Sequence, residues 1–326
     1  MDKEYIKKAI DDAVNSGVVS GISAAFIEKD GNEYYIKGKM GSIDGYEKRE
    51  LTLDALYDMA SCTKVICTTT MIFRLIEDGK LSLDDRVSDY LERFRYEEVT
   101  VADLLLHRSG LPSDMEDKAS LTKENIVDRI YATDLASEPR TITAYSDIGF
   151  ILLGFIIEKI VKRDLASLYE EEILRPLGMV HSSYHPYDKS LCVPTEKTKE
   201  RGLIVGEAHD RKGYLLGDDC ASAGLFSNIV DVAKFVRAYL YREDAILSEK
   251  TVELMRKTDI GNRSYGWDKK YHGDTLYHTG FTGTSILMRF DKMEGVVLLS
   301  NRIHPSRSDH GFLDWRNDLN EEILKG

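Results

Sequence analysis

Alternating apolar and polar positions mark two antiparallel hairpins, one near each end of the chain. Residues 21–38 alternate around Asp30-Gly31, and an Asp-Gly pair between β-forming runs is a strong hairpin signal. The pattern returns at residues 285–300, where two apolar runs flank the segment 291–295. A further strand is expected over 275–279. The sequence therefore predicts antiparallel sheet from both ends of the chain.

Helical spacing of apolar residues dominates between about residues 60 and 255. Over 65–79 apolar side chains recur at helical spacing, and Gly79 supplies a stop signal. The most apolar run, 148–161, is too short to span a bilayer and indicates a buried helix. An amphipathic helix is expected at the amino terminus. A terminal helix shows an apolar face at Phe312, Trp315, Leu319 and Ile323.

These elements predict an α/β (α+β) fold made of two lobes. Sheet-forming segments from approximately 1–58 and 256–326 should join into one sheet lobe. The helical lobe, approximately 59–255, would be inserted into it, with a cleft between the two. The sequence has no internal repeat and no Pro/Gly/Ser-rich linker, so we expect the lobes to pack tightly as a single unit.

Composition and charge narrow the classes of function. The 326 residues suffice for a sizeable core, and the 42% apolar content with only 6 prolines indicates a globular chain. The net charge of -12 argues against a nucleic-acid partner, because that surface requires a basic face.

The start of the chain and its cysteines suggest where the protein works. Residues 1–6 run into the amphipathic helix without the apolar segment of a secretory signal, so we expect a cytoplasmic protein with no membrane partner. The cysteines show no metal-type clustering and are expected to be reduced thiols. They are Cys62, Cys67, Cys192 and Cys220.

A serine and a lysine stand three positions apart at the start of the helix predicted over 65–79. Residues at i and i+3 lie above one another on one helical face, so Ser61 and Lys64 are expected to meet. Ser61 also sits where backbone N–H groups point outward and the helix dipole favours a developing anion. A serine with a base one turn away is a candidate acyl-transfer nucleophile.

Two further clusters follow Ser61-Cys62-Thr63-Lys64 along the chain: Tyr145-Ser146-Asp147 and His278-Thr279-Gly280. In this order the three motifs resemble the serine β-lactamase and penicillin-binding-protein superfamily. The resemblance is closest to its class C β-lactamase and esterase branch, which shows Ser-x-x-Lys, then Tyr-Ser-Asn, then Lys-Thr-Gly or His-Thr-Gly. It spans roughly residues 15–305. Other segments that resemble the family are 78–85, 105–112, 175–179, 223–227 and 278–284.

The resemblance implies a β-lactamase/transpeptidase-like fold, a catalytic unit over 1–326, and no metal or cofactor. By the family pattern Ser61 forms an acyl-enzyme, while Lys64 and Tyr145 share the roles of base and acid. An unperturbed lysine or tyrosine titrates at about pH 10, so neither is a base at pH 7 unless its neighbours shift its pKa. A cation beside a phenol lowers the pKa of the phenol, which is a reason for both to be present.

The same pattern implies the groups that hold the substrate. The backbone N–H groups of Ser61 and Phe281 would form an oxyanion hole. Thr279 lies in the strand that would flank the substrate, and Gly280 and Gly283 would let the substrate approach that strand closely.

Two departures from the family pattern change the expected charge of the site. Asp147 stands where the family has asparagine, and His278 stands where β-lactamases have lysine. With Lys64 charged and His278 neutral the pocket carries about zero net charge, whereas the family's Lys/Asn/Lys version would carry about +2. β-Lactams and D-alanyl-D-alanine peptides present a carboxylate that needs a cation, so we expect neutral esters or amides to be favoured. A distant arginine would restore the charge, with Arg289 and Arg302 as candidates.

Asp147 also bears on which group is the general base. A carboxylate near Lys64 stabilises the ammonium form of the lysine. We therefore expect Tyr145 to be the proton acceptor, and we expect Asp147→Asn to change the pH–rate profile.

Other motifs offer weaker alternatives. Residues 221–224 resemble a nucleophile elbow, but Cys220 replaces the required glycine and no strand precedes it, so a buried turn lining the cleft is expected. His181 and His185 lie in a loop-like segment without the glutamate of a zinc motif. His209-Asp210 resembles a pair that the family places near its cleft.

We therefore predict a serine hydrolase that acts through an acyl-enzyme on an ester or amide, as carboxylesterases do. The enzymatic alternative is a β-lactamase or D-alanyl-D-alanine carboxypeptidase. The non-enzymatic alternative is a penicillin-binding-type receptor that is acylated without turnover. The substrate would be a small ester, amide or β-lactam, and the oligomeric state is left open.

Overall fold

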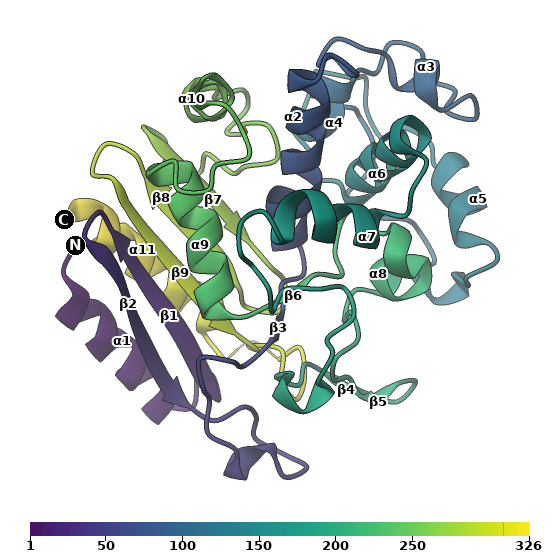
Figure 1. The fold of residues 1–326 in the computed structure, drawn as a ribbon. Coiled ribbons are helices and arrows are strands. Elements are labelled where there is room, and N and C mark those ends of the chain that lie inside the picture. The colour runs from purple at the N-terminus through teal and green to yellow at the C-terminus, as the bar shows by residue number, and fades with distance from the viewer. Residues whose placement is uncertain (309) are drawn as a thin grey trace.

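The computed structural model describes residues 1–308 and 310–326 and combines a five-stranded sheet with a large helical region (Figure 1). Its α-helices are α1 (Lys3–Asn15), α2 (Thr70–Glu77), α3 (Val87–Tyr90), α4 (Val101–Leu105), α5 (Ile126–Tyr131), α6 (Asp147–Val161), α7 (Leu165–Tyr169), α8 (Arg211–Leu216), α9 (Ile229–Leu240), α10 (Glu249–Lys257) and α11 (Phe312–Lys325). Its 3₁₀ turns are η1 (Tyr46–Lys48), η3 (Lys118–Ser120), η5 (Lys189–Leu191) and η6 (Gly217–Asp219), and its π-helical turns are η2 (Lys64–Thr69) and η4 (Glu170–Leu174). Its strands are β1 (Gly21–Glu28), β2 (Gly31–Gly38), β3 (Tyr57–Asp58), β4 (Lys197–Thr198), β5 (Gly202–Leu203), β6 (Phe226–Ser227), β7 (Thr275–Thr279), β8 (Ser285–Arg289) and β9 (Glu294–Ser300).

The main sheet joins the two ends of the chain. Its strand order is β2-β1-β9-β8-β7, and every neighbouring pair is antiparallel. The hairpins predicted from the alternating patterns, β1–β2 around Asp30-Gly31 and β8–β9, are both confirmed. They meet at β1 and β9, where Ile22 pairs with Ser300. A single sheet built from both termini is therefore confirmed.

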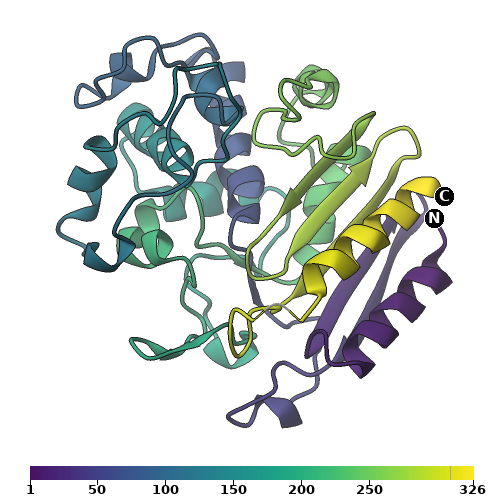
Figure 2. The same ribbon diagram turned by 180° about the vertical axis from the view of Figure 1, so that it is seen from behind.

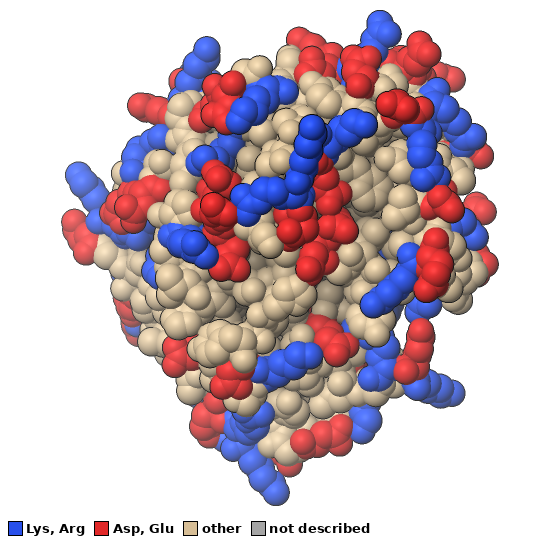
Figure 3. Space-filling view, turned by 45° about the vertical axis from the view of Figure 1, so that its right-hand side comes forward, with Lys and Arg blue, Asp and Glu red and all other residues tan. Residues whose placement is uncertain are grey.

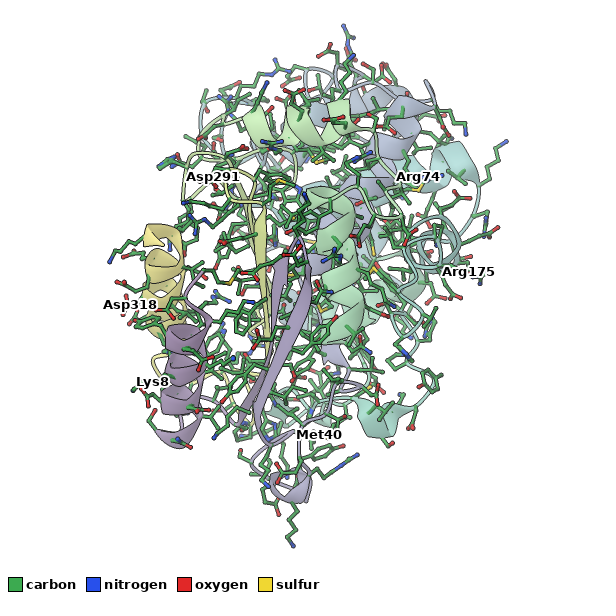
Figure 4. All side chains as sticks on the ribbon, turned by 60° about the vertical axis from the view of Figure 1, so that its left-hand side comes forward. Lys8, Met40, Arg74, Arg175, Asp291 and Asp318 are labelled. Atoms are coloured by element: carbon green, nitrogen blue, oxygen red, sulfur yellow. The ribbon has the colours of Figure 1, made fainter. Side chains whose placement is uncertain are left out.

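Helices cover both faces of this sheet. α1 and α11 lie side by side on one face, as Figure 2 shows, and α9 lies across the other (Figure 1). Successive side chains of β1 point to opposite faces, so Phe26 joins the core beneath α1 and α11 while Ile27 joins the main core. Figure 4 shows Lys8 of α1 and Asp318 of α11 on the side of their helices that faces away from the sheet.

One helix crosses the predicted boundary between the lobes. α9 lies within 59–255, the range expected to form the helical lobe, but it packs against β1 and β9 of the sheet. Gly295 of β9 allows this close packing, because a Cβ at this position would lie 2.6 Å from Cγ1 of Val236. The predicted division into lobes therefore needs correction at α9, which belongs with the sheet.

The helical region is organised around α6. This helix contacts α2, α3, α4, α7 and η2, and most of its side chains are buried. The buried helix predicted over 148–161 is therefore confirmed. None of the described helices combines the length and apolar character that crossing a bilayer requires.

The helix predicted over 65–79 begins with a wider turn than expected. The π-helical η2 runs from Lys64 to Thr69 and continues into α2, and Gly79 follows it in the left-handed region with φ of 68°. π-helical segments in α-helices occur frequently at functional sites. Here the segment carries Lys64, the second residue of the Ser-x-x-Lys motif.

The surface and the cysteines agree with the composition. On the face shown in Figure 3, basic and acidic side chains lie beside one another. The four cysteines are buried and unpaired. This agrees with the expectation of reduced thiols.

Candidate active site

Ser61 lies where a short strand turns sharply into the helix that carries Lys64. β3 pairs with β6, and the chain then passes through Ala60, whose φ of 45° falls in the left-handed region. The Ala60 N–H donates to Oδ1 of the buried Asp58 at 2.8 Å, which supports the turn. A positive φ in a residue with a Cβ is strained, and such strain is found at functional sites. The turn places Ser61 directly before the helix, as the sequence predicts.

Lys64 is fully buried and directs its ammonium group at Ser61. Nζ of Lys64 donates to Oγ of Ser61 at 3.0 Å and to the backbone oxygen of Ser222 at 2.8 Å. It also lies 2.7 Å from Oδ1 of Asp147. A buried ammonium group is stable only with such partners, since burying it alone costs several kcal/mol. The i, i+3 spacing therefore brings the two side chains together.

Tyr145 and Asp147 flank the residue that begins α6. Ser146 caps this helix and donates from Oγ to the backbone oxygen of Pro112 at 2.7 Å. Its backbone N–H donates to Nδ1 of His107 at 3.0 Å, and the His107 ring packs on the Tyr145 ring with centroids 4.5 Å apart. These contacts fix the backbone of the Tyr-Ser-Asp motif. They hold Tyr145 so that its ring centroid lies 5.1 Å from Nζ of Lys64.

The charges of this cluster follow from burial and from close pairing. Burial lowers the pKa of Lys64, but the Asp147 carboxylate and Tyr145 outweigh this effect, so the pKa is raised overall. Burial raises the pKa of Asp147, but the positive charges of Lys64 and Lys212 have a larger, opposite effect. The pKa of Asp147 is therefore lowered overall. Asp147 is therefore a carboxylate and Lys64 an ammonium ion at neutral pH, as expected from the sequence.

The pKa of Tyr145 departs from the expectation. Its phenol is buried, and burial raises its pKa. Lys64 lowers that pKa, as the sequence analysis expects of a neighbouring cation, but the burial effect is larger and the net pKa is raised. The phenol is therefore protonated in the resting enzyme.

The end of β7 is tied to the chain on either side of Ser61. Oγ1 of Thr282 donates to the backbone oxygen of Asp58 at 2.7 Å, and Oγ1 of Thr284 donates to that of Met59 at 3.1 Å. A Cβ at Gly280 would lie 2.6 Å from the same Met59 oxygen. Gly280 therefore lets the chain before Ser61 approach the turn, whereas the sequence analysis expected it to admit the substrate.

Two backbone N–H groups are available beside Ser61. Within the described part of the chain, neither the N–H of Ser61 nor that of Phe281 donates a hydrogen bond to another group. The turn that carries Phe281 is joined to the Ser61 segment through Thr282 and Thr284. An oxyanion hole requires donors that are fixed and unused before the reaction. These two N–H groups meet that condition.

Two cavities share Ser61 and Tyr145 in their walls. The first has a volume of about 370 Å³ and includes Asp147, and the second has about 280 Å³ and includes His278 and Thr279. Both are also lined by Phe281, whose ring is exposed. The structure therefore gathers the predicted site residues around one cleft, with Gly280 behind it.

His278 contributes no positive charge to this cleft. Burial lowers its pKa well below the ordinary value, and the positive charges of Lys64 and Arg263 lower it further. Its Nδ1 lies 3.0 Å from the backbone oxygen of Thr279. The neutral histidine that the sequence analysis assumed is therefore the form expected at neutral pH.

Lys212, which no pattern in the sequence singled out, is a buried cation on the wall of the first cavity. Lys212 lies on α8 and pairs with Asp114 at 3.1 Å, with Asp147 at 3.2 Å and with Asp210 at 3.3 Å. Its local sequence, Asp210-Arg211-Lys212, reads as a solvated charge run. The sequence feature that pointed to this segment was the His209-Asp210 pair, which resembles a pair near the cleft of the family. His209 also lines this cavity.

A second missed cation, Arg263, lines the second cavity. Its guanidinium carbon lies 5.5 Å from the Tyr145 ring centroid, and its Nη1 lies 3.5 Å from Oδ2 of Asp268. Arg263 comes from the loop between α10 and β7, where no pattern in the sequence marks it.

The arginines named from the sequence have other surroundings. Arg289 is buried, donates to the backbone oxygen of Ile323 at 2.6 Å and pairs with Glu294 at 3.6 Å, so it does not restore charge to the cleft. Arg302 lies with its guanidinium carbon 4.8 Å from the Phe281 ring centroid, at the edge of the cleft.

The weaker motifs also have structural explanations. Ser222 and Ala223 are buried and line the first cavity, so the buried turn expected there is confirmed. Nε2 of His185 pairs with Asp218 at 2.5 Å, and the backbone N–H of His181 donates to Asp231. No group of three or more metal-ligating side chains suited to an ion occurs within residues 1–308 and 310–326.

Comparisons with known proteins agree with this geometry. A putative D-alanyl-D-alanine carboxypeptidase of Escherichia coli (strain K12) is 28% identical, covering 82% of this chain and 74% of that protein. An N-acetylmuramyl-L-alanine amidase of Bacillus subtilis (strain 168) is 28% identical, covering 91% and 81%. A solved class C beta-lactamase has a TM-score of 0.78 at 22% identity over 100% of this chain and 99% of its own, which confirms the predicted fold. The model of the Beta-lactamase family matches residues 6–317, and this chain therefore belongs to that family of serine hydrolases.

Proposed function

We propose that this protein hydrolyses an ester or amide through an acyl-enzyme formed at Ser61. The observation that carries the proposal is the 3.0 Å contact between Nζ of the buried Lys64 and Oγ of Ser61, at the meeting point of the two cavities. A serine activated by an adjacent base group is the usual arrangement for nucleophilic catalysis.

The proposed acylation step begins when the coupled Lys64–Tyr145 pair has lost one proton. The pair then accepts the proton of the Ser61 hydroxyl as Oγ bonds to the substrate carbonyl carbon. The N–H groups of Ser61 and Phe281 stabilise the oxyanion, and each such donor contributes on the order of 10²–10³ in rate. The bond between the carbonyl carbon and the leaving oxygen or nitrogen then breaks, and the pair returns its proton to the leaving alcohol or amine. In the second step the pair accepts a proton from water as the water oxygen bonds to the acyl carbon. The ester bond to Ser61 then breaks, and the pair returns this proton to Oγ of Ser61.

The pKa directions predict an alkaline pH dependence. Both Lys64 and Tyr145 have a raised pKa, so the reactive form of the pair becomes about tenfold more abundant with each pH unit up to about pH 10. Asp147→Asn removes a carboxylate that raises both values, so its activity should reach a plateau at a lower pH than that of the wild type. The measurement is kcat/KM for a nitrophenyl ester from about pH 6 to about pH 10, which is the ordinary pKa of both side chains. An unchanged profile in Asp147→Asn would refute this assignment of charges.

A preference for neutral substrates is expected because the cations around the first cavity are paired. Lys64 and Lys212 share the carboxylates of Asp147, Asp114 and Asp210, and His278 is neutral. The other cations that line this cavity also have carboxylate partners: Lys118 pairs with Asp114, Arg211 with Glu200 and Arg307 with Glu196. Parallel assays with a short-chain nitrophenyl ester, a chromogenic cephalosporin and a D-alanyl-D-alanine peptide test this proposal. We expect the ester to be hydrolysed fastest. Faster turnover of the cephalosporin would contradict the preference for neutral substrates.

A second candidate, hydrolysis of D-alanyl peptides, is favoured by Arg263. Its guanidinium lines the second cavity with Thr279 and could pair with the carboxylate at the end of such a peptide. The Escherichia coli relative named as a putative D-alanyl-D-alanine carboxypeptidase supports this candidate.

Arg263→Ala separates the two candidates. For a D-alanyl-D-alanine peptide we expect KM to rise by about tenfold or more, because a charge-assisted hydrogen bond contributes about 1.5–3 kcal/mol. For a neutral ester we expect little change. Equal effects on both substrates would show that Arg263 acts through the fold of the site and does not bind a carboxylate.

The proposed partners are small acyl donors. The buried, unpaired cysteines suit a reducing compartment, so we also propose a cytoplasmic location.

A further inference from the structure

The ion pair between Asp147 and Lys212 extends the site beyond Ser61, Lys64 and Tyr145. Oδ1 of Asp147 lies 2.7 Å from Nζ of Lys64, and Oδ2 lies 3.2 Å from Nζ of Lys212. One carboxylate is therefore held between two ammonium groups. Both lysines are buried, and the Asp147 side chain is only 17% exposed.

We propose that Lys212 is a positioning residue that shares the Asp147 carboxylate with Lys64 and so limits how firmly that carboxylate holds the Lys64 ammonium. This inference rests on the proposed acyl transfer at Ser61. Asp147 adds a negative charge where the family pattern has a neutral asparagine, and Lys212 adds a positive charge that offsets it. With Lys212 present, the negative charge of Asp147 still allows the Lys64 ammonium to lose the proton that it must lose before it can act as a base.

The direction of this effect follows from the charges around each group. Lys212 faces Asp114 from the loop after α4, Asp147 from α6, and Asp210 at the start of α8. Asp114 also pairs with Lys118, and Asp210 caps α8 by accepting the Gly213 N–H, so both carboxylates have a further partner. Within the described residues, the ion pairs of Asp147 are with Lys64 and Lys212 alone.

Lys64 has few other charged neighbours. Among the described residues, Lys64 forms an ion pair with Asp147, and its remaining polar contacts are Ser61, Tyr145 and the Ser222 backbone. Arg263 faces the Tyr145 ring, and the nearby His107 and His278 are neutral because burial lowers the pKa of each. Removing the charge of Lys212 leaves Asp147 paired with Lys64 only. The Lys64–Tyr145 pair should then lose its proton at a higher pH. Removing the charge of Asp147 leaves Lys64 and Lys212 facing each other, which should have the opposite effect.

The test compares the pH profiles of Lys212→Gln, Asp147→Asn and the double variant, using a nitrophenyl ester. For Lys212→Gln we expect kcat/KM at pH 8 to fall by about tenfold for each unit by which the ascending limb moves to higher pH, with its slope retained. For Asp147→Asn we expect the limb to move to lower pH. In the double variant the limb should lie at higher pH than in Asp147→Asn. Lys212→Arg, which keeps the charge, should keep the wild-type profile.

A control separates positioning from general destabilisation. Lys269 is also buried, but it donates to the backbone oxygens of Arg256, Gly273 and Thr275 and lies outside both cavities. Lys269→Gln should lower the temperature of thermal unfolding without moving the ascending limb. A Lys212→Gln profile that keeps its limb, or moves it to lower pH, would overturn the proposal.

Two further comparisons keep the proposal testable. If Lys212→Gln does not fold, the effect of the Lys212 charge can still be measured. Asp147→Asn and the double variant Asp147→Asn/Lys212→Gln differ in that charge. An NMR titration of the Lys64 Nζ in these two variants, each carrying Ser61→Ala, needs no activity. We expect Lys64 to lose its proton at a lower pH when Lys212 is present, and the reverse order or identical curves would refute the inference. Failure of the proposed function would instead appear as hydrolysis that Ser61→Ala does not reduce.

Discussion

Substituting alanine for Ser61 is expected to reduce hydrolysis of a nitrophenyl ester by on the order of 10⁶-fold, which is the scale seen when a serine nucleophile is removed. The reason is chemical, because Ser61 carries the hydroxyl that attacks the substrate, and the other hydroxyl beside the Lys64 ammonium, that of Tyr145, is buried and is assigned to proton transfer. Steady-state rates measured with active-site titration of the wild type would give the loss per active molecule.

The fold should survive this change. Ser61 is only partly buried, and its Oγ accepts a hydrogen bond from Lys64. Ser182→Ala provides a matched control, since Ser182 is a buried serine whose Oγ contacts Ser227 and Asp231 away from both cavities. We expect this control to keep its activity. Comparable losses in both variants would contradict a nucleophilic role for Ser61.

The second large effect is expected for Tyr145→Phe. This substitution removes the hydroxyl but keeps the ring that packs on His107. Since a positioned acid or base contributes about 10²–10⁴ in rate, we expect kcat to fall by that factor while KM changes little. Stopped-flow measurement of the acyl-enzyme would show whether acylation or deacylation is slowed.

If Tyr145→Phe kept the wild-type rate, a different mechanism would be indicated. Lys64 would then be the sole proton acceptor, and the ascending limb of the pH profile would belong to the lysine alone. This mechanism differs from the one proposed, in which the buried phenol takes part. Because the pKa of the phenol is raised, Tyr145 can accept a proton only after the Lys64–Tyr145 pair has lost one.

Local patterns were sufficient to predict most of the fold. The Asp30-Gly31 hairpin, the apolar run 148–161 and the i, i+3 spacing of Ser61 and Lys64 each depend on residues that are near one another in the chain. Such features are encoded by period and turn chemistry. The order of the three catalytic motifs then indicated which distant segments meet.

Features that depend on packing between distant segments were not predictable in this way. α9 has an ordinary amphipathic pattern, and only Gly295 of the facing strand explains how closely it packs on the sheet. Lys212 resembles a surface lysine until Asp114, Asp147 and Asp210 converge on it from three elements. The raised pKa of Tyr145 depends on burial, which the sequence alone does not quantify.

Mass spectrometry of the acid-quenched protein during turnover of an excess of active ester would detect acylation of Ser61 directly. We predict one acyl group per chain, located on the peptide that contains Ser61, which decays once substrate is exhausted and is absent from Ser61→Ala. An adduct that persists would identify a receptor without turnover. An acyl group on another residue, or steady turnover by Ser61→Ala, would contradict acyl transfer at Ser61.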